Sequence, residues 1–204
     1  MKTNRLFTPL AIAATLAIAP TLSADEASAL AVLKSADSDL HAKAMACDEL
    51  GRVGTAKAVP ALAALLADEK LDDYARDGLE RIPDPAAGKA LLEALKTAKG
   101  NQRIGLIMTL GDRREATAVP LLAKIASKDN KTSAAALKSL AQIANKDASK
   151  AILTVLAEGS AEAKKSAAHA ALLAAQRMEK AGQKEAAKKL RDAAAAAGVP
   201  APVE

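Results

Sequence analysis

The sequence predicts an all-α protein, an α–α superhelix in which helical hairpins stack as a solenoid. The phrase KAVPALAALL at 57–66 returns as TAVPLLAKIA at 117–126, and related segments begin at Ala87 and Ala148. The four repeats then start at 58, 87, 118 and 148, with separations of 29, 31 and 30 residues. Half of the residues are apolar, and many of these are alanine, the strongest helix former. A regular period of this length is typical of stacked helical units, so we expect about ten or eleven helices and no sheet.

Each repeat contains two apolar segments of helical period. The second segments carry their key apolar residues at Leu62, Leu91, Leu122 and Ile152. Twelve residues before each of these lies another leucine, at Leu50, Leu79, Leu110 and Leu140. Short turns rich in Gly, Pro, Asn and Asp separate the two segments, at 51–55, 82–85, 111–115 and 144–148. Because one hairpin cannot bury its own apolar face, neighbouring hairpins must stack.

The first 24 residues predict a secretory signal. Lys2 and Arg5 precede ten apolar or small residues from Leu10 to Ala19, about half the length that a membrane-spanning helix needs. We expect cleavage after Ala24, with cleavage after Ala29 as the second choice. The mature chain would then be periplasmic or secreted, without an integral membrane segment.

The remainder divides into a repeat region and a C-terminal end. We assign residues 25–158 to the repeat solenoid, 159–197 to a capping helical hairpin that Gly182 splits, and 198–204 to a flexible tail. A solenoid end needs a polar outer face. The last predicted helix supplies such a face with Lys184, Lys188, Lys189 and Arg191.

Composition argues against a nucleic-acid partner. Loss of the two basic residues of the signal leaves 27 basic and 24 acidic side chains, a net charge of +3, and the two signs are interspersed along the chain. Tyr74 is then the only aromatic residue, although single-strand binders stack bases on several. An RNA-reading solenoid repeats like residues at like positions. The outward positions of the second helices instead hold Pro60, Lys89, Pro120 and Lys150.

No motif for catalysis or metal binding is present. The chain has no phosphate loop, zinc helix, paired cysteines or nucleophile elbow. His41 and Cys47 would lie roughly 120° apart around one helix and about 9 Å apart along it, so they cannot form a catalytic pair. Cys47 precedes Leu50 by three residues, which predicts a buried, inert thiol; a reactive or intermolecular thiol is the alternative. His169 is expected on a helix surface or half-buried, and not as a metal ligand. We therefore expect no enzyme, metal site or cofactor.

Two arginines interrupt the apolar pattern of the first helices. Three residues before each leucine of that helix the repeats carry Cys47, Arg76, Ile107 and Leu137, and three residues after it Val53, Ile82, Arg113 and Ile143. One interpretation is that each arginine lays its stem along the core and pairs locally. The candidate acceptors are Asp73 or Glu80 for Arg76, and Asp112 or Glu115 for Arg113.

The alternative interpretation is functional. Arg76 and Arg113, with Tyr74 and Arg114 beside them, would anchor an acidic protein partner, since tyrosine and arginine are frequent at binding hot spots. Replacement of the two interrupting arginines should distinguish a loss of stability from a loss of binding.

The segment from Ala44 to Leu62, A-x-A-C-x-x-L-G-x-x-G-x-x-x-A-V-P-x-L, resembles HEAT repeats. The period near thirty is similar to the short bacterial HEAT-like type first named from bilin lyases, and residues 38–158 resemble secreted bacterial HEAT-repeat proteins. This resemblance implies a non-enzymatic scaffold or adaptor that binds other proteins. It also implies an alternative, a lyase-like or cofactor-handling accessory protein. A chromophore pocket needs aromatic walls, which a single tyrosine does not provide.

Overall fold

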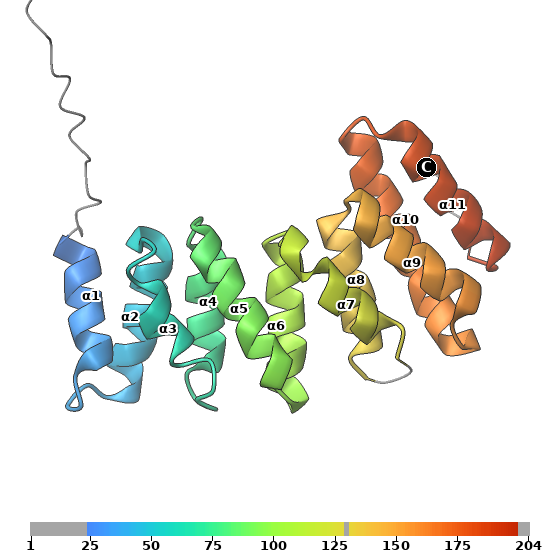
Figure 1. The fold of residues 1–204 in the computed structure, drawn as a ribbon. Coiled ribbons are helices and arrows are strands. Elements are labelled where there is room, and N and C mark those ends of the chain that lie inside the picture. The colour runs from blue at the N-terminus through green and yellow to red at the C-terminus, as the bar shows by residue number, and fades with distance from the viewer. Residues whose placement is uncertain (1–23, 129–130, 200–204) are drawn as a thin grey trace, which may run out of the picture.

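The computed structural model describes residues 24–128 and 131–199, and in these ranges it is helical without any strand (Figure 1). This confirms the all-α prediction and the number of helices. The elements in order are α1 Ala24–Lys34, α2 Leu40–Val53, α3 Val59–Ala63, α4 Asp72–Arg81, α5 Pro85–Thr97, α6 Gly100–Asp112, the 3-10 helix η1 Ala116–Ala118, α7 Val119–Ala126, α8 Ser133–Ile143, α9 Lys146–Glu158, α10 Ala161–Lys180 and α11 Lys184–Ala196.

The helices form two rows. The first helices of the hairpins, α2, α4, α6, α8 and α10, pack side by side in one row. The second helices, α3, α5, α7, α9 and α11, form the other row, and α1 begins the stack against α2 and α3. Neighbouring second helices pack closely at every step except from α5 to α7. At that step the side chain of Glu115, just before η1, lies against Gly88 of α5.

The repeated apolar positions make the core, as their spacing predicted. Leu50, Leu79, Leu110 and Leu140 of the first helices are completely buried, and so are their counterparts Leu62, Leu91, Leu122 and Ile152. Burial of one such side chain stabilises the fold by about 1.5–3 kcal/mol. The core is therefore one continuous layer between the two rows, and no hairpin has a core of its own.

Polar side chains set where several helices begin. Asp39, Asp84, Asn145 and Ser160 each accept a hydrogen bond from a backbone N–H in the first turn, at 2.7–3.3 Å. These caps satisfy donors that have no partner inside the helix. The helices α2 and α6 run to Val53 and Asp112, so two of the predicted turns begin later than their sequence suggested.

Three helices end in the same left-handed turn. Two residues after the last residue of α6, α10 and α11 the backbone has a positive φ, and two backbone hydrogen bonds close the turn around it. Two of these residues are Gly182 (φ 78°) and Gly198 (φ 85°), and the third is Arg114 (φ 53°). Glycine adopts this conformation without steric cost, whereas arginine does not. Arg114 therefore occupies a glycine position. The helix α8 ends differently, at Ala144 (φ 48°), whose N–H donates to the Leu140 carbonyl.

At the C-terminal end α10 and α11 form a hairpin that packs on α8 and α9. Alanines give α10 a closely packed buried face, and Lys184, Lys188 and Lys189 of α11 are exposed on the other side. Residues 1–23 of the predicted signal and 200–204 of the predicted tail lie outside the described residues.

Candidate partner-binding surface

In the described parts of the chain, the exposed large apolar side chains all belong to first helices. They are Leu40 and Met45 of α2, Tyr74 of α4 and Met108 of α6, each between 39% and 55% exposed. Met45 and Tyr74 hold the same repeat position, five residues before the buried leucine of their helix, and Met108 lies one helical turn further along. These four side chains define what we call the first-helix face.

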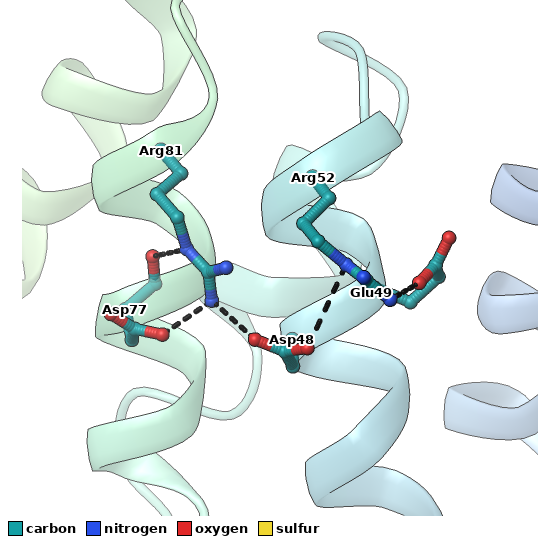
Figure 2. Close-up of polar contacts among 5 residues, drawn as sticks. All are labelled: Asp48, Glu49, Arg52, Asp77 and Arg81. Atoms are coloured by element: carbon teal, nitrogen blue, oxygen red, sulfur yellow. Dashed lines mark hydrogen bonds and ion pairs between the residues drawn. The ribbon is translucent and has the colours of Figure 1, made fainter.

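A charge network lies beside these apolar side chains and connects α2 with α4 (Figure 2). Arg81 of α4 donates a hydrogen bond of 2.8 Å to Asp48 of α2 and also forms an ion pair with Asp77. Arg52 pairs with Asp48 and Glu49. Exposed ion pairs add little to stability. The network matters more for the chemistry of the surface, because it places both positive and negative side chains next to the first-helix face.

The Arg81 hydrogen bond lowers the pKa of Asp48 below its ordinary value of 3.8. Because the pKa of Asp48 is lower in the folded state, the interaction of Asp48 with Arg81 stabilises the fold at pH values above the ordinary pKa. This contribution to stability is lost as the pH falls through the folded-state pKa. An acid titration followed by NMR of the carboxyl carbon should show the low midpoint. In Arg81→Met the midpoint should rise towards 3.8, and in the control Arg52→Met it should move less. Equal midpoints with and without Arg81 would contradict this cause.

Arg76 bridges α4 and α6. Its side chain is 17% exposed and forms an ion pair with Asp73. Its Nη1 donates a hydrogen bond of 3.2 Å to the Thr109 hydroxyl, and its guanidinium lies over Gly105. The predicted local pairing is therefore confirmed for Arg76, with Asp73 as the acceptor.

The predicted local pairing is wrong for Arg113. Its guanidinium does not bind Asp112 or Glu115; Nη1 donates to the backbone carbonyls of Leu79, Glu80 and Ile82 at 2.6–2.7 Å. Nη2 lies 3.4 Å from a fourth carbonyl, that of Asp84. The last carbonyls of a helix lack partners inside it and carry partial negative charge. Arg113 thus caps the C-terminus of α4 from the next hairpin.

The structure separates the four predicted anchor residues. Arg76 and Arg113 hold hairpins together, and their donors are mostly engaged within the protein. Tyr74 lies on the first-helix face, whereas Arg114 is exposed in the turn after α6. Sequence reasoning missed Met45 and Met108 as surface residues. Their phase relative to the buried leucines was the signal that could have found them.

The described residues carry little reactive chemistry. Cys47 is completely buried, and burial raises the pKa of its thiol to about 11, so the thiol is protonated and inert at neutral pH. His169 is on the helix surface, with Nδ1 2.8 Å from the Lys165 carbonyl. No three acidic, histidine or cysteine side chains of the described ranges gather to hold a metal ion. Within those ranges, too, no helix combines the length and hydropathy needed to cross a membrane.

Comparison with known proteins does not assign a family. The sequence matches no protein-family model, and no curated protein matches it significantly.

Proposed function

We propose that the protein is a non-enzymatic scaffold or adaptor of the HEAT-like type, which binds a protein partner through the first-helix face. One observation carries the proposal: the exposed large apolar residues of the described chain gather on three successive first helices. Single exposed apolar residues are ordinary, but a group of them bordered by polar residues marks an interaction surface. Methionine and tyrosine are also enriched at protein interfaces.

The surface indicates the chemistry of the partner. The charge network of Asp48, Asp77, Arg52 and Arg81 presents both signs, so it favours a partner whose apolar patch has a mixed, complementary rim. The alternative, a lyase-like or cofactor-handling role, would need an aromatic residue in an enclosed pocket. Tyr74 lies half exposed in the row of first helices, which favours the scaffold.

We further propose that residues 1–24 direct export, so that the scaffold acts in the cell envelope. The packing of α1 supports cleavage after Ala24. Glu26 is buried and its carboxylate accepts hydrogen bonds from the Thr55 backbone N–H at 2.7 Å and hydroxyl at 2.9 Å. Cleavage after Ala29 would remove this contact between α1 and the turn before α3.

Site-specific photocrosslinking in the exported protein tests the proposal, after intact mass has shown whether the chain starts near Asp25. A crosslinking residue placed at Met45 or Tyr74 should yield a few recurrent protein adducts. The same residue at Lys89, which is exposed on the second-helix row, is the matched control and should yield fewer. Met45→Lys should then weaken binding of the captured partner about fivefold, or roughly 1 kcal/mol. Equal adducts from both rows would contradict a partner surface on the first helices.

A further inference from the structure

A second surface feature lies in the C-terminal half of the stack, whereas most of the first-helix face lies on α2 and α4. A groove of about 710 Å³ opens beside the turns that follow α6, α8 and α10. Its polar lining includes the cations Arg114, Arg177 and Lys180 and the amides Gln142, Asn145 and Gln183. The described residues that line it include no carboxylate. Its volume lies within the range of ligand-binding pockets.

Two of the three cations have side-chain N–H donors that no described protein group accepts. The side chains of Arg114 and Lys180 form no hydrogen bond or ion pair within the described parts of the chain, and both are exposed. Arg114 stands in a left-handed turn where α10 and α11 have glycine, a conformation that costs a residue with a Cβ about 1–2 kcal/mol. Ala144, which also lines the groove, has a positive φ of 48° too, so the turn tolerates a Cβ and does not by itself explain the arginine.

The third cation, Arg177, is held without a direct carboxylate. Gln142 of α8 donates to the Asp112 carboxylate of α6 through its amide nitrogen, and its amide oxygen accepts a hydrogen bond of 2.8 Å from Arg177. This series of hydrogen bonds orients the Arg177 guanidinium through the neutral amide of Gln142. The buried Nε of Arg177 has no hydrogen-bond partner in the described structure. That buried atom is out of reach of a ligand, but the positive charge of Arg177 is not neutralised by a carboxylate, and Gln142 is the one acceptor of its guanidinium among the described residues.

The rest of the lining distinguishes between anionic ligands. A phosphate site needs donors only, whereas a peptide presents both N–H and carbonyl groups. Gln142 and Asn145 already use their amides within the protein, but the amides of Gln176 and Gln183 form no side-chain hydrogen bond in the described residues and offer donors and acceptors. Ile143 and Leu173 add apolar surface. We propose that this groove binds a peptide segment that carries carboxylates, with Arg114, Arg177 and Lys180 holding the carboxylates and the amides pairing with the peptide backbone. Paired arginine–carboxylate hydrogen bonds are among the strongest in proteins.

The test uses the mature protein and a fluorescent ten-residue peptide of alternating Glu and Ala, followed by anisotropy at physiological salt. The Glu peptide should bind at least tenfold more tightly than its Gln counterpart. The double variant Arg114→Gly and Lys180→Gln should bind it at least tenfold more weakly while circular dichroism stays unchanged, because neither side chain has a partner within the described fold.

The double variant Lys34→Gln and Lys89→Gln removes two exposed positive charges far from the groove and should stay within about twofold of the unsubstituted protein. Three results would each overturn the proposal. These are unchanged binding by the groove variant, an equal loss in the remote variant, or displacement of the Glu peptide by inorganic phosphate as readily as by unlabelled peptide. The second result would indicate unspecific charge attraction, and the third a simple oxyanion site.

Discussion

Replacing Arg113 with methionine should lower the free energy of unfolding by about 3 kcal/mol. Methionine keeps the apolar stem but removes the donors to the carbonyls of Leu79, Glu80 and Ile82. A hydrogen bond to a charged group contributes about 1.5–3 kcal/mol, and acceptors left buried without a donor add a penalty. For a domain of this size the melting temperature should fall by about 6–12 °C. Thermal and denaturant unfolding measure both values.

The neighbouring residue gives the control. Arg114→Gly removes the same charge, but the Arg114 side chain makes no polar contact in the described structure and its left-handed turn suits glycine. This variant should keep its stability within about 1 kcal/mol. Hydrogen exchange should also localise the Arg113 effect to the end of α4, because helix ends open locally when their caps are lost. Similar losses in the two variants would show that charge, and not capping, explains the result.

Gly111→Ala should lower the free energy of unfolding by about 2 kcal/mol. A Cβ at Gly111 would lie 2.7 Å from the backbone Cα of Ser139, so α6 and α8 would have to separate. Ser139 also donates a hydrogen bond of 2.8 Å to the Ile107 carbonyl, and that contact would be strained. Overpacking of this kind typically costs about 1–3 kcal/mol. Denaturant unfolding at equilibrium measures the loss.

Gly51→Ala is the matched variant, since Gly51 holds the same repeat position one residue after a buried leucine. Its added methyl group would meet the guanidinium of Arg81, the mobile end of a long side chain, at 2.8 Å. That side chain can move aside, and alanine favours a helix over glycine by up to about 1 kcal/mol. We expect no loss of stability beyond about 0.5 kcal/mol. If both variants lost stability equally, the close approach of α6 and α8 would not be the cause.

Much of the fold could be predicted because its information is local. Leu50, Leu79, Leu110 and Leu140 recur at one phase of a helix, and burial of that phase requires stacking whatever the exact geometry. The same reasoning placed Cys47 in the core and a helix break at Gly182. The Arg76 pair with Asp73 was also predictable, since its two residues are three apart on one helix.

The candidate sites were predictable only in part. The sequence named Tyr74 and Arg114 but grouped them with two arginines that the structure uses between hairpins. Met45 and Met108 escaped notice because apolar residues in an apolar repeat are expected inside. The groove unites residues from 114 to 183, and no periodicity links an arginine after α6 with a lysine at the end of α10.

The sequence by itself determined the helices, their pairing into hairpins and the buried leucine layer, because each follows from the period of apolar residues along the chain. Only the tertiary structure decided what Arg113 binds, how closely α6 approaches α8 at Gly111, and which cations converge on the groove. The physical reason is that backbone carbonyls are the same in every residue, and that distances between helices depend on side chains from several repeats at once. A one-dimensional pattern encodes which face of a helix is buried; it does not encode which polar groups then lie within reach of one another.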